Sequence, residues 1–193
     1  MMRVLRAPLL LVLATACGDD EPTEHTTSVG GSCNGMLTVE SNTSGEHVAM
    51  SAAIDWTNNP PTSGPHWDIW AAWDRQYVEL PRGHYVHNAE HGGVILLYNC
   101  DPACPEVVDG LLAVARAMPS DPMCVAPITK RVIVTGDSLL PPGIQVAAVA
   151  WNHAYTATCF DDYVATFAAE HYAQAPEDFC ANGANVGGTL ITP

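Results

Sequence analysis

The chain has 193 residues, of which 48% are hydrophobic, and its 21 acidic residues against seven basic ones give a formal net charge of −14. An acidic chain of this kind is repelled by nucleic acids and by anionic membrane surfaces, so binding to either is not expected. The length is sufficient for one domain with a substantial core.

The first residues have the pattern of a secretory signal peptide. Arg3 and Arg6 precede an apolar run over residues 7–13, and small residues follow before Cys17. The stretch Leu13-Ala14-Thr15-Ala16-Cys17 resembles the bacterial lipobox, although its leucine lies one place earlier than is usual. The resemblance implies a signal peptide over 1–16 and acylation of Cys17, with palmitate as an expected acyl group. The alternative is a plain cleavable signal, with Cys17 as an ordinary thiol.

A lipid anchor at Cys17 would place the protein in the bacterial cell envelope, on the periplasmic face or at the outer membrane. No later apolar run approaches the roughly 20 residues that a membrane helix requires. Residues 17–32 have few apolar side chains, and we expect them to form a flexible tether. A single globular domain should then occupy residues 33–193.

The cysteines other than Cys17 suit this exported location, because disulfides persist in an oxidising compartment. Their even number predicts up to three disulfides, with fifteen pairings open, and only two of them lie close together in the sequence. The six are Cys33, Cys100, Cys104, Cys124, Cys159 and Cys180.

The predicted elements begin late in the chain, because the region after Cys33 is expected to be mostly loop. Residues 94–98 are a short apolar run after Gly92-Gly93, which indicates a buried strand. A helix over 105–115 should begin at Pro105, since proline is tolerated in the first turn. Two strands at 132–135 and 144–151, a helix over 161–172 and a final strand within 186–191 follow.

This order predicts the α+β class, with a mixed or antiparallel sheet covered by helices and stabilised by disulfides. Two arrangements stay open at this point. One is ferredoxin-like, with the loops before residue 94 as an N-terminal elaboration, and the other is thioredoxin-like.

Two histidine motifs precede the first predicted strand. They are Pro60-Pro61-Thr62-Ser63-Gly64-Pro65-His66 and Val86-His87-Asn88-Ala89-Glu90-His91-Gly92-Gly93. Together with Trp73, Tyr77 and Ala175-Pro176-Glu177, they resemble a bacterial envelope family known only as domain of unknown function 3105, over residues 45–177. Ala89 departs from the leucine usual in that family, which concerns packing. The resemblance implies no established activity.

The histidine spacing itself indicates a metal site. His87 and His91 are four residues apart, which on a helical turn places both rings on one face, and His66 comes from a separate, proline-stiffened loop. Three imidazoles from two rigid segments are a common ligand set for zinc or copper. Glu90, His47 and Met50 are additional candidate ligands. The alternative is that the histidines only hydrogen-bond the loops together.

Copper is expected ahead of zinc, because copper has the higher affinity for nitrogen ligands and is commonly handled in the envelope. The stretch Cys100-Asp101-Pro102-Ala103-Cys104-Pro105 also resembles the Cys-x-x-x-Cys-Pro signature of Sco-type copper chaperones. That resemblance implies that Cys100 and Cys104 are copper ligands or a redox pair. A plain structural disulfide is the alternative.

A hydrolase is a further hypothesis, because His87-Asn88-Ala89-Glu90-His91 matches the His-x-x-Glu-His pattern of inverted zinc peptidases. There Glu90 would be the catalytic base, and Glu170 could complete the metal ligands. Gly92-Gly93 argues against this hypothesis, since those enzymes carry the motif inside a long helix. No other catalytic motif is found in the chain.

The sequence therefore predicts a lipid-anchored envelope protein that binds a transition metal for storage, sensing or transfer and is not an enzyme. Its partner would be another envelope metalloprotein. The opposing hypothesis is a structural or partner-binding lipoprotein without metal. Neither the disulfide pairing nor the oligomeric state follows from the sequence.

Overall fold

The computed structural model describes residues 24–41, 44–101 and 103–192, so the predicted signal peptide and Cys17 lie outside the described residues. Three helices and ten strands are present in that part of the chain. The helices are α1 (Arg82–Glu90), α2 (Pro105–Ala117) and α3 (Tyr163–His171). The strands are β1 (Glu24–Gly30), β2 (Gly35–Glu40), β3 (His47–Val48), β4 (His66–Trp67), β5 (Arg75–Glu79), β6 (Val94–Tyr98), β7 (Val132–Gly136), β8 (Val146–Ala150), β9 (His153–Ala157) and β10 (Thr189–Leu190).

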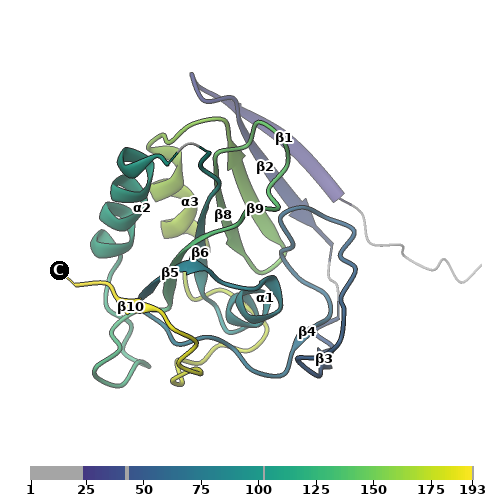
Figure 1. The fold of residues 1–193 in the computed structure, drawn as a ribbon, viewed down its shortest axis with the longest axis vertical. Coiled ribbons are helices and arrows are strands. Elements are labelled where there is room, and N and C mark those ends of the chain that lie inside the picture. The colour runs from purple at the N-terminus through teal and green to yellow at the C-terminus, as the bar shows by residue number, and fades with distance from the viewer. Residues whose placement is uncertain (1–23, 42–43, 102, 193) are drawn as a thin grey trace, which may run out of the picture.

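One mixed sheet of eight strands organises the molecule, in the order β1-β2-β9-β8-β6-β7-β5-β10, and β3 and β4 form a separate pair (Figure 1). At its centre, β6 runs parallel to β7 and antiparallel to β8. The connection from β6 to β7 passes through α2, and β8 and β9 form a hairpin that leads to α3. This connectivity follows the thioredoxin-like alternative. The ferredoxin-like alternative fails, because it requires a strand between the two that α2 joins.

The sheet separates two hydrophobic cores, because successive side chains of a strand point to opposite faces. On one face, Val94 and Leu96 of β6 pack with α2 and α3. On the other face, Ile95 and Leu97 pack with α1 and with Trp73. Figure 1 shows α2 and α3 side by side, with α1 apart from them near β3 and β4. The predicted α+β class with a helix-covered mixed sheet is therefore confirmed, as three layers.

Most of the later elements agree with the sequence analysis, whereas β9 and the earlier elements were not predicted. Strand β6 has the predicted bounds, α2 begins at Pro105, and α3 lies inside the predicted helix. The region expected to be mostly loop contains β2, β5 and α1. Helix α1 lacks an apolar stripe, because eight of its nine residues are buried and several of these are polar. Its helical period is therefore hidden in the sequence.

Strand β1 corrects the prediction of a flexible tether for residues 24–30, and residues 17–23 of the predicted tether lie outside the described residues. Glu24–Gly30 pairs antiparallel with β2, with Thr26 opposite Thr38 and Thr27 opposite Leu37. β-branched residues suit an extended backbone even where they are not buried. The low apolar content that suggested a tether instead reflects an exposed edge strand.

Three disulfides join the six cysteines, as their even number predicted. Cys33–Cys159 connects the start of β2 to the end of β9, and Cys124–Cys180 connects the loop after α2 to the segment after α3. Cys100–Cys104 closes the short loop between β6 and α2. In the described part of the chain, no helix is both long and apolar enough to cross a membrane.

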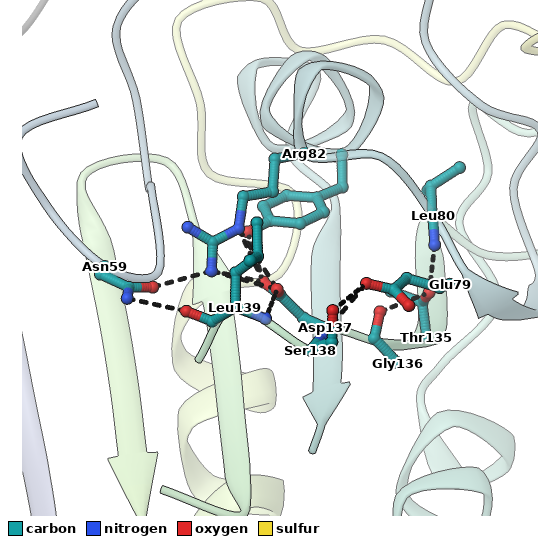
Figure 2. A network of polar contacts seen from close by, with 10 residues as sticks. Asn59, Glu79, Leu80, Arg82, Thr135, Gly136, Asp137, Ser138 and Leu139 are labelled. Atoms are coloured by element: carbon teal, nitrogen blue, oxygen red, sulfur yellow. Dashed lines mark hydrogen bonds and ion pairs between the residues drawn. The ribbon is translucent and has the colours of Figure 1, made fainter. Parts of the chain in front are cut away.

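A buried polar network fixes the N-terminal end of α1 to the end of β7 (Figure 2). Arg82 donates one bifurcated hydrogen bond from Nε to both carboxylate oxygens of Asp137 and another from Nη2 to the same carboxylate, and Nη2 also donates to Asn59. Asp137 is 3% exposed and also accepts a hydrogen bond from Tyr85. Buried charges of this kind are tolerated only when they are paired and hydrogen-bonded. The network therefore fixes the first turn of α1 relative to the sheet, and with it the position of the histidines on that helix.

Candidate metal centre

Four side chains from three elements converge beside α1. They are His47 of β3, His66 of β4, and His87 and Glu90 of α1, each with a candidate ligand atom within 4.8 Å of the others. The parallel pairing of β3 with β4 sets His47 opposite His66. The three imidazole centroids are 4.6 to 4.8 Å apart.

The segment after β4 is fastened to α1 by side chains of the helix. His84 and His87 donate from Nδ1 to the carbonyls of Ile69 and Trp67, at 2.7 and 2.6 Å. Asn88 bonds both the N–H and the C=O of Ala71. Every second residue of the segment after β4 is thus bonded to a side chain of α1. The helix residues that bond successive positions are three or four places apart, so they lie on one face of the helix. This match brings His66 to the helix face that carries His87.

The hydrogen bonds of His66 and His87 determine which ring nitrogen is available. Nδ1 of His66 lies 2.9 Å from the carbonyl of Gly64, and Nδ1 of His87 lies 2.6 Å from that of Trp67. A carbonyl only accepts, so Nδ1 carries the proton, and the neutral ring has a lone pair on Nε2. Both Nε2 atoms are buried and have no hydrogen-bond partner. Metal-binding histidines characteristically donate their other ring N–H to a backbone carbonyl or a carboxylate.

Glu90 faces two of these rings. Its Oε2 lies 2.9 Å from Nε2 of His66 and 3.1 Å from Nε2 of His47, and the contact with His66 is not aligned as a hydrogen bond. Metal–ligand bonds of about 2 Å in a tetrahedral site place neighbouring ligand atoms roughly 3.3 Å apart. The two distances from Oε2 of Glu90, 2.9 and 3.1 Å, are close to that value. A Cβ at Gly45 would lie 1.7 Å from Oε1 of Glu90, so the glycine leaves the space that this carboxylate occupies.

Burial differs among the four residues. His66, His87 and Glu90 are 0%, 1% and 4% exposed, whereas the side chain of His47 is 43% exposed. Trp70 packs against the ring of His87, and Trp151 packs edge-on against His66. The group is therefore mostly buried, with one candidate ligand at the surface.

The ionisation of the site suits a cation. Burial lowers the pKa of His87 to about 4, helped by the nearby charges of His66 and His47. Burial acts to raise the pKa of Glu90, but the close contact with His66 and the hydrogen bond and charge of His47 outweigh it and lower this pKa to about 2. Metal ligands must be a neutral imidazole and an ionised carboxylate. His87 and Glu90 are in these forms at neutral pH.

A pH-dependent stability follows for protein treated with a chelator. The pKa values of His87 and His171 are lowered from 6.5 to about 4, chiefly by burial, so the unfolded chain binds more protons below pH 6.5. The contribution of these two histidines to the free energy of unfolding is therefore fully present above pH 6.5, and it is lost as the pH falls toward 4. We expect the melting temperature to fall steadily between pH 6.5 and 4.

Thermal unfolding at several pH values measures this loss. His171 contacts His153 and is not part of the group around Glu90. His171→Gln should therefore remove the part of the fall in melting temperature that His171 causes and leave the part that His87 causes. A melting temperature that stayed constant from pH 7 to 4.5 would contradict these pKa directions.

His91 is placed differently from its partners in the sequence prediction. Its ring lies 4.6 Å from that of His87, but its ligand atom groups with Glu90 and Glu177 and not with His47 and His66. The reason is local: α1 ends at Glu90, His91 is the cap residue, and Gly92 follows with a φ of +83°. His91 is nevertheless buried, and burial lowers its pKa to about 3.

The other sequence candidates are exposed or bonded elsewhere. Met50 is 47% exposed on a turn. Cys100 and Cys104 are joined to each other, so neither is a thiolate in this structure. Glu170 is exposed on α3, which packs on the sheet face opposite α1. Glu177 was not predicted as a ligand; its only sequence signal was the Ala175-Pro176-Glu177 string of the family resemblance.

A family model described as "Protein of unknown function (DUF3105)" matches residues 47–183 of the chain. The match begins at His47 and includes His66, His87, Glu90, His91 and Glu177. Searches of curated proteins and of solved structures gave no match.

Proposed function

We propose that this protein, which belongs to the family described as a protein of unknown function (DUF3105), binds a divalent transition metal ion through His47, His66, His87 and Glu90. One observation carries the proposal. The Nε2 atoms of His66 and His87 are buried without a hydrogen-bond partner, while the Nδ1 atoms of the same rings are held by backbone carbonyls.

Packing alone explains only half of this arrangement. If His66 and His87 merely held loops together, their Nδ1 bonds would suffice, and their Nε2 atoms could be replaced by carbon. A buried acceptor without a partner costs about 1–3 kcal/mol. Two such acceptors beside an ionised carboxylate are unfavourable unless a cation binds between them. A metal ion satisfies both imidazoles and Glu90 at once.

The ligand set favours Cu²⁺ ahead of Zn²⁺. Three imidazoles and one carboxylate suit either ion, and the general affinity order places Cu²⁺ above Zn²⁺ for the same ligands. Cu⁺ is disfavoured, because it prefers sulfur ligands, whereas the four grouped residues offer imidazole nitrogen and carboxylate oxygen, and Cys100 and Cys104 are disulfide-bonded. The proposal therefore does not require the resemblance to Sco-type proteins.

The physiological role we propose is metal storage, sensing or transfer in the bacterial cell envelope, with the protein anchored through a lipid on Cys17. Four protein ligands fill a tetrahedral shell, whereas catalytic metal sites keep a position open. The exposed side chain of His47 offers a route for exchange with a partner metalloprotein, because this ligand can leave without opening the core. The hydrolase hypothesis is less favoured, since α1 ends within the motif and Glu170 is remote from it.

Metal analysis of protein purified without an affinity tag tests this proposal. We expect the first equivalent of Cu²⁺ or Zn²⁺ to bind with a dissociation constant on the order of nanomolar or tighter, as in buried structural sites. Competition between the two ions for a limiting amount of protein should favour Cu²⁺. Protein that contains no metal, and takes up neither ion from a weak chelator, would contradict the proposal.

A further inference from the structure

A second group of ligands adjoins the first. Glu90, His91 and Glu177 each have a candidate ligand atom within 4.8 Å of the other two. We propose that these three residues bind a second divalent metal ion, and that the carboxylate of Glu90 is shared between the two ions. This inference rests on the proposed function, because Glu90 belongs to both groups.

The segment after α3 brings Glu177 to the end of α1. The backbone N–H of Glu177 donates to the carbonyl of Glu90 at 3.1 Å, and that of Ala173 donates to Gly92 at 2.9 Å. Oε2 of Glu177 then lies 3.2 Å from Nε2 of His91. The Cys124–Cys180 disulfide joins the same segment to the loop after α2. Two backbone contacts and a covalent bond thus hold Glu177 beside His91.

The ring of His91 is buried and faces a carboxylate. Its side chain is 1% exposed, and its Nε2 lies 3.2 Å from Oε2 of Glu177, so Nε2 is the nitrogen that an ion held with Glu177 would bind. Nδ1 of the same ring is buried without a hydrogen-bond partner and points away from Glu177. The guanidinium of Arg131 is paired with Asp121 and Asp178. It therefore does not neutralise the carboxylates of Glu90 and Glu177.

The geometry and the charges suit two adjacent ions. A carboxylate has two oxygens and can bridge metal ions about 3.5–4 Å apart. Oε2 of Glu90 already faces His47 and His66, and the ring of His91 lies 4.6 Å from that of His87. The second ion would have one imidazole and two carboxylates, of which Glu177 is 47% exposed. Repulsion from the first ion should make the second bind more weakly and fill last.

Equilibrium dialysis against Zn²⁺, with metal content measured by mass spectrometry, tests the second site on the intact, disulfide-bonded protein. We expect two ions per chain at saturation, and one in Glu177→Gln. Glu177→Gln keeps the backbone bond to Glu90, so the variant should fold. Glu170→Gln is the matched control, since it removes a glutamate from the opposite face of the molecule and should still bind two ions.

A second readout uses Cu²⁺, because two copper ions bridged by one carboxylate couple magnetically. The electron paramagnetic resonance spectrum of the fully loaded protein should be broadened relative to protein with one equivalent, and Glu177→Gln should keep the one-equivalent spectrum. One ion in the wild type would overturn the second site and leave the proposed function intact. Two ions in Glu177→Gln would also overturn it. No ion in any form would overturn both proposals.

Discussion

Replacing His87 with alanine should lower the affinity for the first metal ion by at least about 100-fold, since even outer-shell changes cost 10- to 100-fold. The variant removes an imidazole whose Nε2 is buried and has no other partner. It also removes the hydrogen bond from His87 to the carbonyl of Trp67, and this bond helps to hold the segment that carries His66. Chelator competition with Zn²⁺ or Cu²⁺ measures the loss directly.

His84→Ala is the matched control for this variant. His84 lies one turn earlier on α1, is 3% exposed, and donates from Nδ1 to the carbonyl of Ile69 as His87 does to that of Trp67. Its ring packs against Trp67 and is not among the grouped ligands. His84→Ala should lower the melting temperature and keep the metal affinity within about threefold. An equal loss of affinity in both variants would show that the loops, and not the ligand, determine binding.

The largest stability change is expected for Arg131→Met. Arg131 is 1% exposed, forms an ion pair with the buried Asp121, and donates from Nη1 to the carbonyl of His91. Methionine fills similar volume but leaves the Asp121 carboxylate buried without its cation. Removing one partner of a buried ion pair costs about 3–5 kcal/mol. For a domain of this size, that corresponds to a fall in melting temperature of roughly 6–20 °C.

Arg116→Met provides the comparison, because Arg116 is exposed and its Nε donates to the carbonyl of Thr192. Surface changes of this kind stay within about 0.5 kcal/mol. Urea unfolding of the two variants and the wild type, with intact disulfides, gives the free energies. If Arg131→Met were as stable as Arg116→Met, the ion pairs of Arg131 would not contribute to stability.

The part of the fold that the sequence predicted is the part with simple periodicity. Residues 94–98 form a continuous apolar run, and they are β6, buried between two cores. Pro105 marks the first turn of α2, whose apolar residues recur at helical spacing. Both signals are local, so no knowledge of distant contacts is needed to read them.

The part that was missed depends on long-range contacts and on buried polar groups. Strands β3 and β4 have two residues each, and only their pairing brings His47 to His66. Glu177 reaches the site through a backbone bond to Glu90, far away in the sequence. Neither contact leaves a periodic pattern. Sequence reasoning therefore selected His66, His87 and His91, gave Glu90 and His47 only as additional candidates, and omitted Glu177.

His91 illustrates how a spacing rule depends on the end of a helix. Residues four apart share a face only while the helix continues through both. Here α1 ends at Glu90, so the ring of His91 stays near that of His87 while its ligand atom joins a different group. The same Gly92-Gly93 pair that argued against a peptidase also turns His91 toward Glu177.

Anomalous scattering from a crystal grown with one equivalent of Cu²⁺ or Zn²⁺ tests the central claim most directly. A single strong peak should lie about 2 Å from Nε2 of His66 and of His87, with His47 and Glu90 completing the ligands. A peak on the protein surface, or no peak while His66 and His87 keep their present hydrogen bonds, would contradict a metal centre at this position.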